Sequence, residues 1–233
     1  MWNENLTYSA LLFGSLVFPF IFSFEKNIRF IQYIKPILLA ILLPGAFFIV
    51  WDVAFTKLGF WSFNPQFTFD VRVLGLPIEE WLFFVVIPYC SLFIYEVLKF
   101  YLPKLAFQKQ VMQFLLLVAV ILLITGVLEF GIWYTFICLA TTAVFLFILL
   151  NQKYLYSNLS HFLLAFLVAC IPMFIVNGVL TAMPVVEYNS AYFSNVRIGT
   201  IPAEDFSYFL LLFSMNFLVY EKLKTNRTPR GKR

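Results

Sequence analysis

Charged residues are scarce in this chain of 233 residues: they make up 12% of it, whereas an ordinary soluble domain carries about 25%. Hydrophobic residues make up 62%. Apolar runs of about 20 residues recur along the sequence, the length at which a helix crosses roughly 30 Å of membrane hydrocarbon. The composition excludes a soluble fold and predicts an integral membrane protein.

Side chains and motifs that bind metals or cofactors are also few. The single histidine, His161, and the cysteines Cys90, Cys138 and Cys170 form no zinc or iron–sulfur spacing. There is no G-x-G-x-x-G, no phosphate loop and no H-E-x-x-H. Phe84 stands where a membrane protease of the E-E-x-x-x-R type needs arginine, and the last apolar run has no lysine for retinal. The sequence therefore predicts no metal and no cofactor.

Seven apolar runs predict seven membrane helices, at residues 8–24, 36–55, 78–98, 111–128, 132–150, 161–180 and 203–219. The weakest boundary is the short link at 129–131, without which the number falls to six. Lysine and arginine test the number, because cytoplasmic loops are enriched in them. Seven spans place thirteen of these residues on one side and three on the other. This asymmetry predicts a cytoplasmic C-terminus and an external N-terminus in the inner membrane of the cell.

A repeat without gaps relates residues 52–99 to 177–224, with 11 identities in 48 positions. The predicted units are a first repeat (1–100), a connector with the fourth helix (101–131), a second repeat (132–224) and a basic cytoplasmic tail (225–233). Three helices plus one connector is an even number, so both repeats run the same way through the membrane. The predicted fold is an all-α membrane protein: two parallel three-helix repeats joined by a connector helix.

Each repeat carries a proline and two adjacent acids at the start of an apolar helix. The two copies are Leu76-Pro77-Ile78-Glu79-Glu80-Trp81-Leu82-Phe83-Phe84 and Ile201-Pro202-Ala203-Glu204-Asp205-Phe206-Ser207-Tyr208-Phe209. The prolines suit the first helical turn, and acids there complement the positive end of a helix. Because an acid costs roughly 3 kcal/mol near the bilayer centre, the duplicated pairs also predict a functional site. The catalytic candidates are Glu79, Glu80, Glu204 and Asp205.

Other polar and aromatic residues recur around these acids. The candidate supporting residues are Asp52, Asn64, Arg72, Pro77, Trp81, Phe84, Asn177, Asn189, Arg197, Pro202, Phe206 and Phe209. The arginines could pair with the acids or be ordinary interface arginines, and the asparagines could line a shared site or stabilise turns. The aromatic rings could face a cation. Farther along the motif helices, Glu96 with Lys99 and Glu221 with Lys224 predict exposed (i, i+3) pairs.

At these residues the chain resembles the integral-membrane lycopene cyclase family of carotenoid biosynthesis. The pattern P-x-E-[ED] occurs twice, and Trp51-Asp52, Phe63-Asn64-Pro65 and Tyr188-Asn189 add to it. The resemblance covers nearly the whole chain. It implies a lycopene β-cyclase, an isomerase without a cofactor. One carboxylic acid would protonate a terminal C=C, and a second carboxylate would stabilise the cation and take the departing proton. Because Asp52 corresponds to Asn177, the halves need not be chemically equivalent.

The resemblance implies lycopene or a related acyclic carotenoid and the lipid bilayer as partners, and no nucleic acid. Self-association and contact with other carotenoid enzymes stay open, as does the number of sites. The rival interpretation is a small transporter of three, one and three helices. A carrier should place polar groups midway along its helices, whereas this sequence concentrates them at one end, which favours the enzyme.

The charge asymmetry predicts the topology directly. A reporter fused after Arg233 should be cytoplasmic, and one inserted near Asn195 should be external, because the seven spans put these positions on opposite sides. Reporter activity or protease access in intact cells measures this. Finding both reporters on the same side would contradict the parallel repeat.

Overall fold

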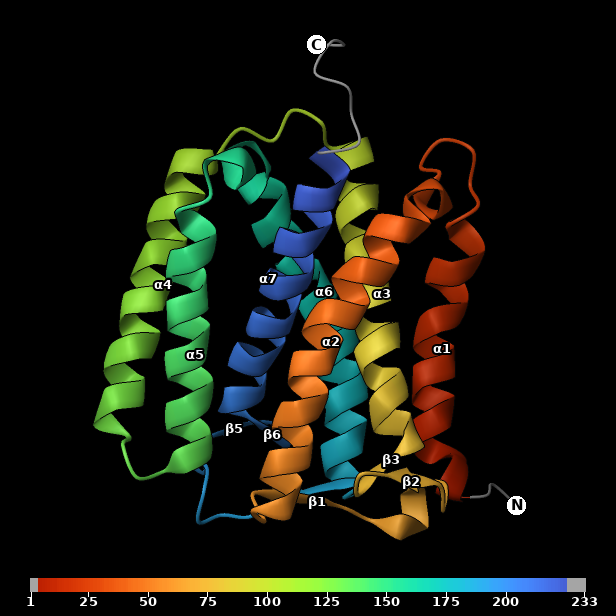
Figure 1. The fold of residues 1–233 in the computed structure, drawn as a ribbon, viewed down its shortest axis with the longest axis vertical. Coiled ribbons are helices and arrows are strands. Elements are labelled where there is room, and N and C mark those ends of the chain that lie inside the picture. The colour runs from red at the N-terminus through yellow and green to blue at the C-terminus, as the bar shows by residue number, and fades with distance from the viewer. Residues whose placement is uncertain (1–3, 226–233) are drawn as a thin grey trace.

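The computed structural model describes residues 4–225, and over that range it is a bundle of seven α-helices with short strands at one end (Figure 1). The helices are α1 (Thr7–Phe22), α2 (Ile34–Lys57), α3 (Ile78–Tyr101), α4 (Gln108–Leu128), α5 (Trp133–Leu150), α6 (Leu159–Ala182) and α7 (Ala203–Thr225). Each overlaps one predicted apolar run, so the seven-helix prediction is confirmed. Apart from Thr225, the predicted basic tail lies outside the described residues.

Six of the seven helices in this range, α1 to α6, are long and apolar enough to cross a membrane when the 3₁₀ turns directly before α1, α2 and α6 are counted with them. Their outward faces carry large apolar side chains such as Phe13, Val50 and Leu128, each at least 70% exposed, as contact with lipid requires. The seventh, α7, is less apolar because it carries charges in its first and last turns. It lies among the other helices (Figure 1), and its contacts with α2, α3, α5 and α6 bury its acids Glu204, Asp205 and Glu221 in protein.

The helices of the two repeats interleave in the bundle. Within each repeat the first helix contacts the third, α1 on α3 and α5 on α7. The second helix of each repeat also contacts the third helix of the other, so that α2 lies on α7 and α6 lies on α3. The connector α4 packs along α5 at one edge of the bundle (Figure 1). Glycine allows this contact to be close, since a Cβ added at Gly126 would lie only 3.2 Å from the Leu139 Cβ.

Within the described part of the chain, six short strands lie at the same end of the bundle, here called the strand end (Figure 1). Strand β1 (Trp61–Phe63) pairs antiparallel with β4 (Val186–Tyr188) and so joins the loops of the two repeats. Strands β2 (Arg72–Val73) and β3 (Leu76–Pro77) form a hairpin before α3, and β5 (Arg197–Ile198) and β6 (Ile201–Pro202) form the equivalent hairpin before α7. Because both sets of loops share one end, the parallel orientation of the repeats is confirmed.

The motif prolines lie one residue earlier than predicted. Pro77 is the last residue of β3 and Pro202 the last of β6, and the helices begin at the next residue. The expectation that they lie in the first helical turn was wrong, because pairing within the hairpin holds Pro77 in an extended conformation, with ψ 152°. The two acids of each motif still lie in the first turn of the helix.

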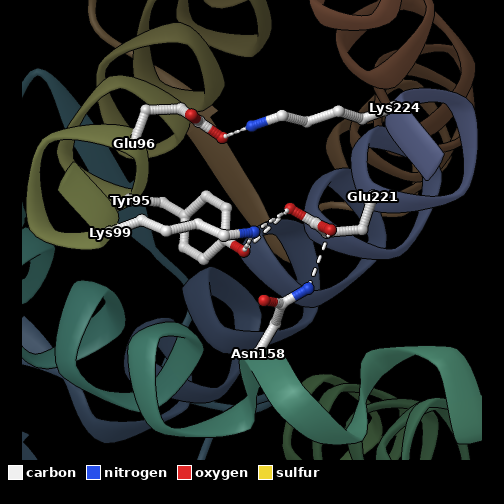
Figure 2. Close-up of polar contacts among 6 residues, drawn as sticks. All are labelled: Tyr95, Glu96, Lys99, Asn158, Glu221 and Lys224. Atoms are coloured by element: carbon white, nitrogen blue, oxygen red, sulfur yellow. Dashed lines mark hydrogen bonds and ion pairs between the residues drawn. The ribbon is translucent and has the colours of Figure 1, made fainter. Parts of the chain in front are cut away.

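At the opposite end, crossed ion pairs join α3 to α7 (Figure 2). Lys99 on α3 pairs with Glu221 on α7 at 3.1 Å, and Lys224 on α7 pairs with Glu96 on α3. Both glutamates are buried. The expectation of exposed pairs within each helix was therefore wrong. The helices face one another here, and a buried carboxylate needs a partner that reaches it inside the interface.

Glu221 has the larger set of partners in this network (Figure 2). One of its oxygens accepts a hydrogen bond from the Tyr95 hydroxyl and the other accepts one from the Asn158 amide, each at 2.8 Å. Residues from both repeats thus meet at one carboxylate. This contact fixes the spacing of α3 and α7, the two helices that begin with the paired acids.

A double-mutant cycle tests the crossed arrangement. Combining Lys99→Met with Glu221→Gln should reveal a coupling free energy of about 1 kcal/mol or more, because the two groups are in direct contact. The same cycle between Lys99 and Glu96 should give a value close to zero. Unfolding of the detergent-solubilised protein by heat measures both. Coupling confined to Lys99 and Glu96 would mean that the pairs form within α3.

Candidate active site

A cavity of about 490 Å³ lies between α1, α3 and α6 and reaches α2, α5 and α7 at the strand end. One wall is a stripe of α3 side chains, spaced mostly three or four residues apart from Glu80 to Leu98. This stripe is about 27 Å long, because a helix rises 1.5 Å per residue. Most of the lining is apolar, and the carboxyl groups of Asp52, Glu80 and Asp205 line the strand end.

The cavity opens sideways between α1 and α6. Gly14 and Phe18 on α1 and Pro172 on α6 line it and are also exposed on the outer face of the bundle. In a membrane that face meets lipid. A long apolar molecule dissolved in the bilayer can therefore enter between these helices without passing through water.

Two carboxyl groups of the first repeat lie at the strand end of the cavity. Asp52 and Glu80 are both buried in the protein and both line this end. Each also accepts a hydrogen bond from a tyrosine: the Tyr8 hydroxyl donates to Glu80 Oε2 at 2.7 Å, and the Tyr208 hydroxyl donates to Asp52 Oδ1 at 2.6 Å. Since Tyr208 belongs to α7, the second repeat contributes directly to the surroundings of this pair.

Asp205 has a different set of partners, although it stands at the repeat position of Glu80. Its Oδ1 accepts from the Tyr134 hydroxyl at 2.6 Å, and its Oδ2 accepts from the Asn177 amide and the Tyr188 hydroxyl, each at 2.7 Å. Asn177 stands at the repeat position of Asp52. Three donors around one carboxyl group stabilise its charged form.

Tyr188 lies in β4, outside the helices. Burial, and next the charge of Asp205, raise the pKa of its phenol well above the ordinary value. The phenol therefore keeps its proton at neutral pH. Its role toward Asp205 is that of a permanent hydrogen-bond donor.

The other acid of each motif does not line the cavity. Glu79 Oε1 accepts hydrogen bonds from the Phe69 backbone N–H at 2.8 Å and from the Ser9 hydroxyl at 3.2 Å. In the second repeat, Glu204 Oε1 accepts the equivalent hydrogen bonds from the Ser194 backbone N–H and the Thr135 hydroxyl. These acids tie the loop before the motif to the first helix of each repeat. Neighbouring positions on a helix lie about 100° apart, which is why the two acids of a motif have different surroundings.

Among the predicted supporting residues, three line the cavity: Asp52, Asn177 and Phe209. The predicted supporting residues outside its lining are Asn64, Arg72, Pro77, Trp81, Phe84, Asn189, Arg197, Pro202 and Phe206. Trp81 donates its indole N–H to a loop carbonyl. Phe84 stacks on Phe48 with 5.8 Å between ring centroids, and Phe206 lies beside Phe174.

The two arginines bind loop carbonyls. Arg72 donates to the Phe63 carbonyl at 3.1 Å and to the Gly75 carbonyl at 3.3 Å, and Arg197 donates to the Thr200 carbonyl. Within residues 4–225 no lysine or arginine forms an ion pair with an acid of the cavity. In the same range no group of three or more His, Cys, Asp or Glu side chains is arranged to hold a metal ion.

The two asparagines stabilise turns, which is one of the two alternatives that the sequence left open. Asn64 Oδ1 accepts from the Gln66 N–H at 3.0 Å, and Asn189 Oδ1 accepts from the Ala191 N–H at 3.1 Å. Asn64 is partly buried and Asn189 is exposed, and both lie outside the lining of the cavity.

Sequence reasoning assigned no hydrogen-bond donors to the cavity acids. In the structure four tyrosines have this role: Tyr8, Tyr134, Tyr188 and Tyr208. A signal for the first two exists in the sequence. Tyr8-Ser9 and Tyr134-Thr135 are equivalent at an offset of 126 residues, whereas the rest of the repeat has an offset of 125. An alignment without gaps therefore separates them by one position.

The fold and the site define a membrane protein with a carboxyl-lined apolar cavity shared by two repeats. The lycopene cyclase family model matches residues 5–98 and 131–223. These segments make up most of the chain, which therefore belongs to the lycopene cyclase family. They correspond to the two repeats on either side of α4, and they confirm the resemblance seen in the motifs. Comparisons with curated proteins and with solved structures give no match.

The loop contacts of Glu79 can be tested separately from the cavity. Glu79→Ala leaves the Phe69 N–H and the Ser9 hydroxyl without their acceptor, which should cost about 1–3 kcal/mol of unfolding free energy. Glu79→Gln is the matched control, because its amide oxygen can still accept both hydrogen bonds. Thermal unfolding, together with hydrogen exchange at the Phe69 amide, measures the difference. Equal stability of the two variants would exclude this role for Glu79.

Proposed function

We propose that this chain is a lycopene β-cyclase, which closes the ψ-ends of lycopene into β-ionone rings by acid–base catalysis without a cofactor. The observation that carries the proposal is a single cavity that combines a carboxyl-lined end with a long apolar slot. Membership of the lycopene cyclase family gives the substrate class, a carotenoid.

The shape of the cavity suits an elongated hydrocarbon. Lycopene is a conjugated polyene with an isolated terminal C=C at each end. Entry with one end first would place that C=C beside Asp52, Glu80 and Asp205. The polyene would then follow α3 along a slot of about 27 Å and leave through the gap between α1 and α6.

The carboxyl groups supply the chemistry that cyclisation needs. A carboxylic acid adds its proton to the terminal C=C and forms a tertiary carbocation. The neighbouring C=C attacks this cation, so that a ring C–C bond forms and the positive charge moves into the ring. A carboxylate then removes a proton from the adjacent ring carbon and leaves the ring C=C. One proton is gained and one is lost, so the reaction is an isomerisation and transfers no electrons.

Aromatic side chains support the same proposal. Trp61, Phe63, Phe83, Tyr208 and Phe209 line the cavity together with the acids. The faces of aromatic rings attract a cation, and the attraction is stronger where water is absent. The faces of these rings would stabilise the carbocation.

The arrangement supports one active site for the whole chain. Acids from both repeats line the same end of one cavity, and Tyr208 of the second repeat donates to Asp52 of the first. Cyclisation of both ends of lycopene would therefore require two rounds of binding. We further propose that the strand end, with the site, lies on the non-cytoplasmic side of the inner membrane, as the lysine and arginine distribution predicts.

Cyclisation in deuterated water tests the proposal. Addition of lycopene made in ordinary water to the reconstituted protein should yield β-ionone rings that each carry one deuterium at the protonated carbon, because the acid proton exchanges with solvent. Mass spectrometry and NMR of the pigments measure this. A ringed product without solvent deuterium would exclude a carboxylic acid as the initiator, and absence of any ringed product would refute the cyclase itself.

A further inference from the structure

We infer that Asp52 and Glu80 together hold the proton that starts the reaction, whereas Asp205 stays ionised and receives the departing proton. The assignment of these catalytic steps rests on the proposed cyclisation. The placement of the proton does not, because it follows from the hydrogen bonds of the protein alone.

The pairing of Asp52 with Glu80 requires a proton. Asp52 stands at the repeat position of Asn177, whose amide contacts Asp205 at 2.7 Å, and it lines the same end of the cavity as Glu80. Two facing carboxylates have only acceptor oxygens, so they form a hydrogen bond with one another only if one of them is protonated. The other oxygens of the pair accept from Tyr8 and Tyr208, which leaves the shared proton between the two acids. The pair thus holds one proton at the end of the cavity, where a terminal C=C would lie.

Asp205 is surrounded by donors instead. Both of its oxygens are occupied by O–H or N–H groups of Tyr134, Asn177 and Tyr188. Protonation of Asp205 would weaken all three hydrogen bonds, because a neutral carboxylic acid is a poorer acceptor than a carboxylate. Asp205 therefore presents a carboxylate to the cavity, suited to stabilise the cation and to accept its proton.

Two differences between the repeats produce this division. The position of Asp52 holds Asn177 in the second repeat, so a proton-sharing acid is replaced by an amide donor. The position of Tyr188 holds Phe63 in the first repeat, so Glu80 lacks the third donor that Asp205 has. Both differences act in the same direction. The proton that Asp205 gains has to return to the pair before the next turnover.

Infrared spectroscopy of the purified protein without substrate locates the proton. A protonated carboxyl group has a C=O stretch that is separate from carboxylate bands and shifts in deuterated water. This band should be lost in Asp52→Asn, because Tyr208 occupies the Asn oxygen and the new amide then donates to Glu80. It should persist in Asp205→Asn. The converse change, Asn177→Asp, should add a second band by pairing a new acid with Asp205.

Loss of the band in Asp205→Asn with its persistence in Asp52→Asn would overturn the inference, as would the absence of a new band in Asn177→Asp. If Asp52→Asn does not fold, Glu80→Gln gives the same test, because its amide would donate to Asp52. Turnover of lycopene should fall at least about 100-fold in Asp52→Asn. If the wild-type protein and its variants show the predicted C=O bands but the wild-type protein forms no rings, only the proposed cyclase activity is refuted. Rings made by Asp52→Asn at the wild-type rate would refute only the assignment.

Discussion

A carboxyl group within a membrane protein has to obtain its hydrogen bonds from the protein, because the hydrocarbon offers none. Asp52, Glu80 and Asp205 meet this requirement with tyrosine hydroxyls and an amide. Lysines and arginines take no part in these contacts within residues 4–225. The acids therefore stay available to a substrate, whereas the buried glutamates at the opposite end are neutralised by lysine and serve to hold α3 and α7 together.

The interleaved packing of the repeats explains why one site arises from two similar halves. Each second helix lies on the third helix of the other repeat, and β1 pairs with β4 across the two loops. This brings Asp52 within reach of Tyr208 and places Asp205 at the same end of the cavity. Once the halves share a site, their equivalent positions are free to differ. The exchange of an acid for an amide at Asn177 is the difference with the clearest chemical consequence.

Much of the fold could be predicted, because apolar length and lysine distribution are properties of single segments. The repeat then fixed the relative direction of the halves and identified Glu80, Asp205, Asp52 and Asn177 as neighbours of a site. What could not be predicted depends on contacts between segments distant in sequence. The repeat did not distinguish Glu79 from Glu80 as a catalytic candidate, because both positions hold an acid in each motif, although only Glu80 lines the cavity. The donor Tyr8 was hidden by a shift of one residue between the repeats.

The central claim is that both repeats contribute acids to one active site. Pigment analysis of lycopene-producing cells that express Glu80→Gln or Asp205→Asn tests it most directly, with Glu79→Gln as the control outside the cavity. Each of the two cavity variants should leave lycopene uncyclised although the protein accumulates, and Glu79→Gln should still form rings. Substantial ring formation by either cavity variant alone would mean that each repeat works independently, and would contradict the shared site.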